Sequence, residues 1–303
     1  MVAILGPTAR GKSALAEHLA RAFAGELINS DASAFYRELS VGVTKPSPET
    51  RREFRYHLLD LTTLEQGYDL MDYLEVAEKA IEKVHRGGAL PIVVGGSGLY
   101  ARALLDGYRP HSIEVTDEIR QHVRSLDLPL AQQELLALDP KAYDRIDLKN
   151  PRRVTRALEL AMANGGPVEP SKKIPRTDLR IQRFYLQPAK PLLDARIKKR
   201  TEEMWEPWVE EVVQLEKKGL IRWLEVRRPI GYSSVLAFNR GEMSRDQAIE
   251  TVVRQTVKLA KKQKTWLKKE TEHEFCHHFL IDRQEQWERV PETASALLAE
   301  FLS

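Results

Sequence analysis

The residues best suited to chemistry lie near the start of the chain, in the segment Gly6–Ser13, "GPTARGKS". An apolar run, "VAIL", precedes it, and a stretch with an apolar stripe follows it to Phe23. In that context the glycines allow successive backbone N–H groups to converge on an anion, while Lys12 adds a positive charge. The Ser13 hydroxyl can bind Mg²⁺. The segment therefore predicts a site for a di- or triphosphate, without identifying the reaction.

Two polar residues follow predicted strands further along the chain. Asp31 comes after "GELIN", and Ser97 lies within "GGSGLY" after "LPIVV". Because ligands bind at the carboxyl ends of strands in open α/β sheets, we expect both side chains near the phosphate loop. A carboxylate there could act as a general base, hold a metal ion, or only cap the segment that follows. Ser97 could belong to a plain turn, but three neighbouring glycines favour a ligand-facing position.

Acidic residues at other strand ends bear on whether the protein hydrolyses ATP. A hydrolase of the P-loop class uses such a residue to hold the metal or to orient water. The run "LPIVV" ends without a carboxylate, whereas "YHLLD" ends in Asp60. The pattern disfavours ATP hydrolysis without excluding it.

A strongly basic segment lies near the C-terminus. Every charged residue between positions 251 and 269 is basic: Arg254, Lys258, Lys261, Lys262, Lys264, Lys268 and Lys269. The first four recur at helical intervals on one side. Charge runs usually form a solvated helix face, but the missing carboxylates favour a surface that binds nucleic-acid phosphates.

The elements that position these residues alternate between short strands and helices, which predicts a parallel sheet with helical crossovers. From Asp117 the patterns are only helical, until a strand is predicted at 180–188. We expect an α/β fold with a P-loop NTPase-like parallel sheet, an inserted helical domain and a helical C-terminal region. The expected divisions are 1–116, 117–176 and 177–303. Two long helices are predicted within 194–219 and 244–270.

Composition narrows the class of protein further. The single cysteine, Cys276, excludes an internal disulfide and suits a reducing cytoplasm. We expect neither a membrane span nor a signal peptide, and nothing demands more than a monomer. The histidines lack metal-ligand spacing, including those of "HEFCHH". Four tryptophans could stack on bases, but Trp205 and Trp208 are better explained as packing residues of an amphipathic helix.

Taken in order, these segments resemble the tRNA dimethylallyltransferases, which prenylate an adenosine next to the anticodon. The resemblance covers nearly the whole chain. It rests on the loop and on "DASAFYRELSVGVTKP", "YHLLD", "GGSGLYARALLDG", "NPRRVTRALEL", "RPIGY" and "RQTVKLAKKQKTW". The loop is shared by many families, whereas "NPRRVTRALE", "GGSGLY" and "KKQKTW" are far more specific.

The resemblance implies a channel that dimethylallyl diphosphate enters from the loop side and the adenine of the tRNA anticodon stem-loop from the other. Asp31 would be the base for the N6 proton, with Ser97 beside the reacting centre, and Mg²⁺ would bind at Ser13. The residues implied to bind the diphosphate are Gly6, Pro7, Thr8, Ala9, Arg10, Gly11, Lys12, Ser13 and Arg228. Those implied to contact tRNA are Asp31, Ala32, Ser33, Ala34, Ser97, Arg120, Arg152, Arg153, Arg156, Arg228, Gly231, Lys261, Lys262, Gln263 and Trp266.

The chain departs from the family pattern at several of these positions. The family usually has glutamine where this chain has Ala34, so direct readout of the adenine edge lacks its usual side chain. Ala32 replaces a common serine, Ser97 a threonine, and Lys262 an arginine. Arg10 replaces a small residue within the loop and could add a phosphate contact.

Three other functions share part of the pattern. A small-molecule kinase would have the same loop and a lid-like insertion, but no need for the basic helix. An adenylate dimethylallyltransferase, which acts on the free nucleotide, would need neither the insertion nor that helix. A non-catalytic RNA-binding ATPase would use the basic surface but not Asp31 and Ser97.

Overall fold

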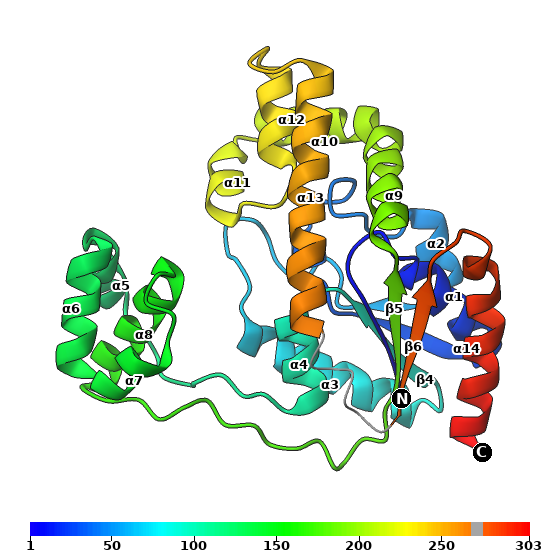
Figure 1. The fold of residues 1–303 in the computed structure, drawn as a ribbon, viewed down its shortest axis with the longest axis horizontal. Coiled ribbons are helices and arrows are strands. Elements are labelled where there is room, and N and C mark those ends of the chain that lie inside the picture. The colour runs from blue at the N-terminus through cyan, green and yellow to red at the C-terminus, as the bar shows by residue number, and fades with distance from the viewer. Residues whose placement is uncertain (268–274) are drawn as a thin grey trace. The chain divides into compact units, whose positions relative to one another are not determined.

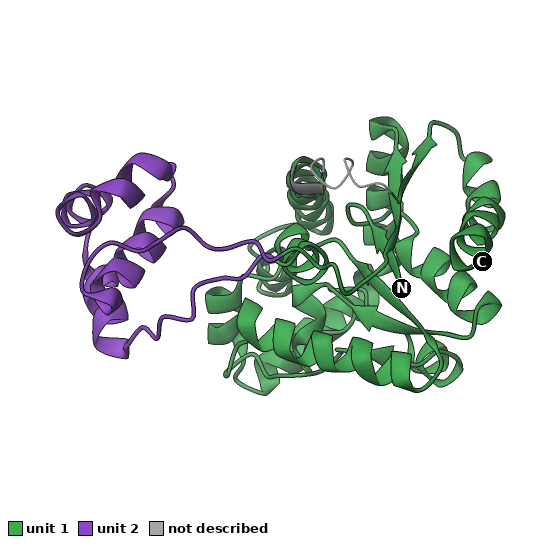
Figure 2. Cartoon of the chain, turned by 90° about the horizontal axis from the view of Figure 1, so that it is seen from below, with its two compact units in different colours: residues 1–107, 175–303 green, residues 108–174 purple. Residues whose placement is uncertain are grey.

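The computed structural model describes residues 1–267 and 275–303, with the side chains of residues 266 and 267 excepted. The chain forms two compact units, one of residues 1–107 and 175–303 and the other of residues 108–174 (Figures 1 and 2). The basic residues Lys268 and Lys269 and the side chain of Trp266 lie outside the described residues.

A parallel sheet forms the centre of the larger unit. Among the described residues it has six strands in the order β3-β2-β4-β1-β5-β6. The strands are β1 (Val2–Leu5), β2 (Gly25–Asn29), β3 (Tyr56–His57), β4 (Leu90–Gly95), β5 (Gln182–Pro188) and β6 (Cys276–Ile281). Near-continuous apolar runs such as "VAIL" suit strands that are covered on both faces. An α/β fold with a parallel sheet is thus confirmed.

Two strand predictions need correction. Strand β6, which contains the histidines of "CHHFLI", lies within the C-terminal region that we expected to be helical. Its register pairs Tyr185 with His278 and Leu186 with Phe279, so tertiary pairing with β5 supports it. Strand β3 ends at His57, so Asp60 does not end a strand.

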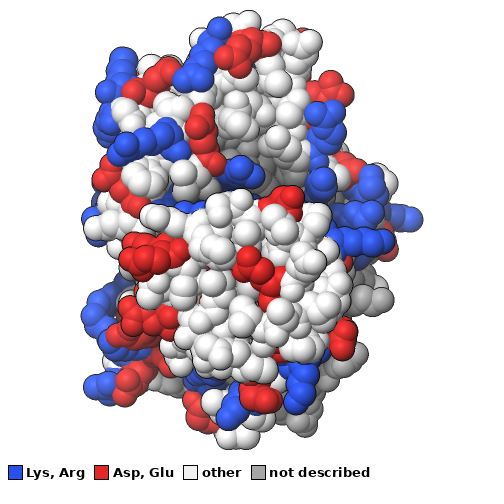
Figure 3. Space-filling view, turned by 90° about the vertical axis from the view of Figure 1, so that its left-hand side faces the viewer, with Lys and Arg blue, Asp and Glu red and all other residues white. Residues whose placement is uncertain are grey.

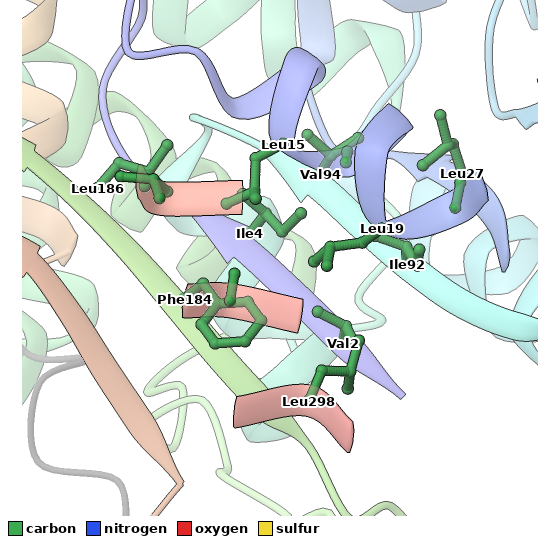
Figure 4. Packing of buried hydrophobic residues seen from close by; sticks show 14 of the residues in the cluster. Val2, Ile4, Leu15, Leu19, Leu27, Ile92, Val94, Phe184, Leu186 and Leu298 are labelled. Carbon is green, nitrogen blue, oxygen red and sulfur yellow. The ribbon is translucent and has the colours of Figure 1, made fainter. Parts of the chain in front are cut away.

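Helices cover this sheet and form the rest of the larger unit. They are α1 (Lys12–Ala22), the 3₁₀ helix η1 (Ala32–Phe35), α2 (Pro48–Glu53), α3 (Leu70–Arg86), α4 (Gly98–Asp106), α9 (Lys190–Glu203), α10 (Trp205–Lys217), α11 (Ile221–Arg227), α12 (Tyr232–Asn239), α13 (Arg245–Leu267) and α14 (Gln286–Leu302). Apolar side chains of the sheet pack against α1 and α14 in one cluster that includes Ile4, Leu19, Phe184 and Leu298 (Figure 4). This packing fixes α1, and with it the end of the phosphate loop.

A second apolar cluster joins α10, α12 and α13. We expected one helix over 194–219, but the chain forms α9 and α10 with a break at Met204. Pro207 explains the break, because proline cannot donate to the carbonyl of the preceding turn and its ring clashes there. Trp205 and Trp208 are buried in this cluster, which confirms their interpretation as packing residues.

The smaller unit is helical. It contains α5 (Asp117–Ser125), α6 (Leu128–Leu138), α7 (Pro140–Arg145) and α8 (Pro151–Asn164). Its own apolar cluster includes Leu135, Val154 and Leu158. An antiparallel bridge between Tyr108 and Lys173 joins its two ends. None of the described helices is long and apolar enough to cross a membrane.

Candidate active site

Three adjoining cavities follow one another through the larger unit. The loop cavity, of about 160 Å³, is lined by Thr8–Ala14 and reaches Asp31. The central cavity, of about 280 Å³, is lined by Asp31, Ser97 and residues 227–230. The outer cavity, of about 810 Å³, lies between α11, α12 and α13. Asp31 lines both the loop and the central cavities, whereas Arg228 lines both the central and the outer ones.

The phosphate loop is held by contacts from distant elements. Gln263 of α13 accepts the Thr8 N–H at 2.9 Å, and Arg200 of α9 donates to the Thr8 hydroxyl at 3.1 Å. Arg196 donates to the Ala9 carbonyl at 3.2 Å. Lys12 and Ser13 are the first two residues of α1, and a helix leaves its first four N–H groups without intrahelical partners. The loop therefore meets the loop cavity with a helix N-terminus, which favours an anion.

The surroundings of Lys12 suit a side chain that binds an anion. Its Nζ donates to the Pro7 carbonyl at 2.9 Å. Burial lowers the pKa of Lys12 to about 8, although the negative charge of Asp31 acts in the opposite direction. A diphosphate in this cavity would hold the ammonium in its charged form.

Arg10 lies beneath the loop. It is 2% exposed, and its Nη1 donates to the Leu186 carbonyl on β5 at 2.6 Å. Burial lowers its pKa to about 10. The guanidinium thus links the phosphate loop to strand β5. The sequence indicated a possible contact of Arg10 with phosphate and did not predict this contact with the Leu186 carbonyl.

Asp31 is held in place by its backbone and caps η1. Asn29 accepts the Asp31 N–H at 3.1 Å and donates to the Asp31 carbonyl at 3.1 Å. Oδ1 of Asp31 accepts the N–H of Ser33 at 3.1 Å. Oδ2 has no hydrogen-bond partner among residues 1–267 and 275–303. The cap and a chemical role are therefore compatible, because they use different oxygens.

Ser97 lies beside Asp31, as its strand-end position predicted. Its Oγ accepts the N–H of Ala32 at 3.4 Å, and both residues line the central cavity with Ser33. The neighbouring glycines make room for protein atoms: a Cβ at Gly95 would lie 2.4 Å from the Ser30 carbonyl oxygen, and one at Gly96 would lie 2.7 Å from Nε2 of Gln263.

Ala34 and Gly231 are buried, unlike most of the residues expected to contact tRNA. Ala34 lines the loop cavity and is absent from the lining of the central one. Gly231 has a φ of +88°, and a Cβ there would lie 2.1 Å from the ring of Trp208.

Arg200 is the functional residue that sequence reasoning missed most clearly. It lines both the loop and the central cavities, whereas Arg228 lines the central and outer ones. Burial lowers the pKa of Arg200, opposed by the charge of Asp31. Arg200 lies within a helix whose pattern is dominated by charged residues, so nothing in its local sequence distinguished it. Gln263, which the resemblance implies to contact tRNA, is buried, lines the central cavity and accepts the Thr8 N–H, a contact that was not predicted.

Asp60 belongs to a structural ion cluster. It pairs with Lys45 at 2.6 Å and with Arg51 at 2.5 Å. Burial alone would raise the pKa of Asp60, but the hydrogen bonds and charges of these two partners hold it below its usual value. An acidic residue committed in this way does not supply the metal-binding carboxylate of a P-loop hydrolase.

The basic residues of α13 are exposed. Arg254, Lys258, Lys261, Lys262 and Lys264 have no carboxylate within ion-pair distance in the part of the chain that the structure describes. Lys258 and Lys262 line the outer cavity. Figure 3 shows that Lys and Arg side chains on one face of the molecule are interspersed with Asp and Glu. These cations of α13 therefore differ from many other surface Lys and Arg residues in that they lack carboxylate partners among the described residues.

The four arginines expected to contact tRNA in the smaller unit are also exposed. Three of them have carboxylate neighbours: Arg120 with Asp117 at 3.7 Å, Arg153 with Asp147 at 3.9 Å, and Arg156 with Glu159 at 3.3 Å. Exposed ion pairs of this kind contribute little to the free energy of folding, on the order of 0–1 kcal/mol. A phosphate could therefore replace the carboxylate beside each arginine.

Among the described residues no group of three or more His, Cys, Asp or Glu could hold a metal ion. The exposed Ser13 hydroxyl and the Asp31 carboxylate both line the loop cavity. These oxygen donors suit Mg²⁺, which usually keeps several waters and binds through one or two protein groups together with substrate phosphates.

Comparisons with known proteins place the chain in a family. The family model for IPP transferase matches residues 34–270. The tRNA dimethylallyltransferase of Synechococcus sp. strain WH7803 is 38% identical, with 89% of this chain and 86% of that protein covered. That of Thermobifida fusca is 36% identical, with 89% and 87% covered.

Solved structures show the same fold. The tRNA isopentenylpyrophosphate transferase of Bacillus halodurans superposes with a TM-score of 0.68 at 27% identity, covering 99% of this chain and 97% of that one. A eukaryotic dimethylallyltransferase whose structure is described as acting on tRNA superposes with a TM-score of 0.83 at 24% identity, covering 100% of this chain and 79% of that one. The chain belongs to the IPP transferase family, the tRNA dimethylallyltransferases.

Proposed function

We propose that this protein transfers a dimethylallyl group from dimethylallyl diphosphate to N6 of the adenosine on the 3′ side of the anticodon in tRNA, and releases diphosphate. One observation carries the proposal within the family. Asp31 lies between a cavity that contains the phosphate loop and one that leads toward the unpaired cations of α13. A diphosphate bound on one side and a base entering from the other would meet at this carboxylate.

The chemistry that we propose suits these groups. The exocyclic amine of adenine is a weak nucleophile, but the allylic carbon becomes electrophilic as the bond to the diphosphate oxygen breaks. The bond between that carbon and N6 forms, and the N6 proton passes to Oδ2 of Asp31. The leaving diphosphate carries the negative charge, which Lys12, Arg200 and the loop amides are arranged to stabilise. Ser97 and Asn29 support this arrangement by fixing the backbone on either side of Asp31.

We include Mg²⁺ in the proposal, held by the Ser13 hydroxyl and the diphosphate itself. Its positive charge would stabilise the negative charge that develops on the leaving diphosphate. The rest of the phosphate site is Gly6, Pro7, Thr8, Ala9, Gly11 and Lys12, with Arg10 as a brace from below.

Recognition of tRNA follows from the exposed cations. A base that is to be modified must leave its stack, at a cost of a few kcal/mol. Phosphate contacts elsewhere on the stem-loop would offset that cost. We assign them to Lys261 and Lys262 of α13, to Arg228, and to the insertion arginines. We further propose that the enzyme works in the cytoplasm as a monomer.

A transfer assay tests the proposal directly. The protein is incubated with Mg²⁺ and labelled dimethylallyl diphosphate, and is offered tRNA, AMP or no acceptor. We expect label in tRNA only. Label in AMP would identify an adenylate dimethylallyltransferase, and label in neither acceptor would favour a kinase or an RNA-binding ATPase.

A further inference from the structure

The loop of residues 40–45 forms a wall of two cavities at once. Gly42, Val43 and Thr44 line the central cavity, and Val43–Lys45 line the loop cavity. The loop is a tight turn, in which the N–H of Thr44 donates to the Val41 carbonyl at 2.9 Å and that of Lys45 to the Ser40 carbonyl at 3.0 Å. Its position therefore sets the shape of the site on both sides of Asp31.

This loop binds a carboxylate with its own backbone. Oε2 of Glu211, on α10, accepts the N–H of Ser40 at 2.8 Å and that of Val41 at 2.7 Å. Oε1 accepts the Gly42 N–H at 3.5 Å and the Tyr232 hydroxyl at 2.5 Å. Successive amides that converge on one anion form a strong, directional anchor. Glu211 supplies that anion from a helix 170 residues away in the chain.

The same helix also contacts the opposite wall. The Trp208 ring lies against two glycines: a Cβ at Gly42 would lie 2.3 Å from its Nε1, and one at Gly231 would lie 2.1 Å from its ring. Tyr232, which follows Gly231, packs edge-on against Trp208 at 5.3 Å and donates to Glu211. The residues just before Gly231 line the central cavity. One turn of α10 thus joins the 40–45 loop to the 228–231 loop.

We propose that Glu211 is a positioning residue of the active site, which ties these two loops together and so sets the width of the central cavity. The proposal rests on the function proposed above. Glu211 does not line either reaction cavity, so it acts through the loop. Its loss would leave three amides without an acceptor and would free the wall next to Asp31. Misplacement of reacting groups by about 1 Å can slow an enzyme on the order of 10²-fold.

The test compares Glu211→Gln with two controls. Glutamine loses the charge and keeps only one acceptor oxygen, so it cannot accept from Ser40 and Val41 on one side and from Gly42 and Tyr232 on the other, as the carboxylate does. Glu210→Gln makes the same change on the exposed neighbour. Val212→Ala removes buried volume beside Glu211 and lowers stability, but it leaves in place the carboxylate that accepts the loop N–H groups. Three quantities are measured for each: hydrogen exchange in a peptide covering residues 40–45, the Kd of inorganic pyrophosphate, and the single-turnover rate of transfer to tRNA.

For Glu211→Gln we expect exchange in residues 40–45 to be at least about tenfold faster, pyrophosphate to bind several-fold more weakly, and transfer to be slower by on the order of 10²-fold. Neither control should change exchange in this peptide or the kinetics, even where Val212→Ala lowers the melting temperature. Tyr232→Phe removes only one hydrogen bond to Glu211, so it should change all three quantities in the same direction but by less. It replaces Glu211→Gln as the test variant if Glu211→Gln does not fold.

Unchanged exchange in Glu211→Gln would overturn the proposal, as would faster exchange with wild-type binding and transfer. If Val212→Ala lost as much binding and transfer activity as Glu211→Gln, the loss would be explained by lower stability alone, and the proposal would be overturned too. If the wild-type protein did not prenylate tRNA, the proposed function would fail, while exchange and pyrophosphate binding would still decide whether Glu211 positions the loop.

Discussion

Asp31 can combine its structural role with the proposed chemical one because its carboxylate has two oxygens. Oδ1 caps η1 through Ser33, and Asn29 holds the backbone of Asp31 from both sides. A carboxylate held in this way points its second oxygen in a defined direction. The position alone left capping and catalysis as alternatives, and the hydrogen bonds show that the cap uses only Oδ1, so the two roles are compatible.

Asp31→Asn separates the two roles, since the amide oxygen can still accept from Ser33 but the side chain no longer removes a proton. We expect the single-turnover transfer rate to fall by about 10²–10⁴-fold, the usual range for a general base. Pyrophosphate should bind as tightly or slightly more tightly, because a negative charge that acts on Lys12 and Arg200 is lost. An unchanged transfer rate would refute the assignment of Asp31 as the base.

Lys12 gives the site a pH dependence. Burial lowers the pKa of Lys12 to about 8, so its ammonium is charged at neutral pH and loses its proton as the pH rises through about 8. We expect the advantage of the wild-type protein over Lys12→Met in pyrophosphate affinity to be greatest below pH 8. It should fall by up to about tenfold per pH unit above that. Comparison with the variant cancels the titration of pyrophosphate itself. A ratio of the two Kd values that stays constant between pH 7 and 9.5 would contradict this role.

At the scale of the element, α13 serves two parts of the site with two faces. Gln263 is buried and accepts the Thr8 N–H of the phosphate loop. Lys258 and Lys262 line the outer cavity, and Lys261 is exposed. The helix therefore connects the phosphate loop to the surface assigned to tRNA, and its outward charges can be changed without disturbing Gln263.

Charge reversal at Lys261 and Lys262 tests that surface. We expect the double variant to bind tRNA more weakly, because it replaces two unpaired cations with repulsive carboxylates. The slope of log K against log salt concentration should become shallower by about 0.7–0.9 for each lost phosphate contact. The measurement is a salt titration of tRNA binding, with the double variant Lys79→Glu and Lys83→Glu on α3 as the control that matches the change in net charge. A slope equal to that of the control would remove these lysines from the interface.

At the scale of the whole molecule, the chain divides the proposed work between two units. The smaller unit has its own apolar cluster, and its ends are joined by the bridge between Tyr108 and Lys173 and by a hydrogen bond from the Arg109 N–H to the Lys172 carbonyl at 3.0 Å. All described residues that line the loop and central cavities belong to the larger unit. The smaller unit is thus separable from the proposed chemistry.

Replacement of residues 109–173 by a short Gly-Ser linker tests whether the smaller unit is needed for tRNA binding only. The paired ends allow a short linker to close the gap. We expect pyrophosphate to bind within about threefold of the wild-type Kd, because the phosphate site is intact, and tRNA to bind at least about tenfold more weakly. Substitution of Arg120, Arg152, Arg153 and Arg156 by glutamine in the full chain should reproduce much of that loss. Unchanged tRNA affinity in both variants would exclude the insertion from recognition.

Local patterns in the amino-acid sequence were sufficient to predict the phosphate loop, the strand ends that carry Asp31 and Ser97, and the helical insertion. These are short-range features, in which glycine spacing, apolar periodicity and strand direction act within a few residues. The same patterns did not predict strand β6, which depends on pairing with β5, or the break between α9 and α10.

The distant side chains that complete the site could be identified only from the packing of the folded chain. Arg200, Gln263 and Glu211 come from three helices, and each gains its partner on a loop between about 170 and 255 residues away. Arg200 and Glu211 lie in sequences typical of ordinary charged helices, because a hydrogen bond across the fold depends on packing and leaves no periodic signal. For Gln263 the resemblance implied a contact with tRNA, and the contact with Thr8 was not predicted. Arg10 shows the same limit: its place in the loop indicated a phosphate contact, whereas burial against β5 gave it the Leu186 carbonyl as a partner.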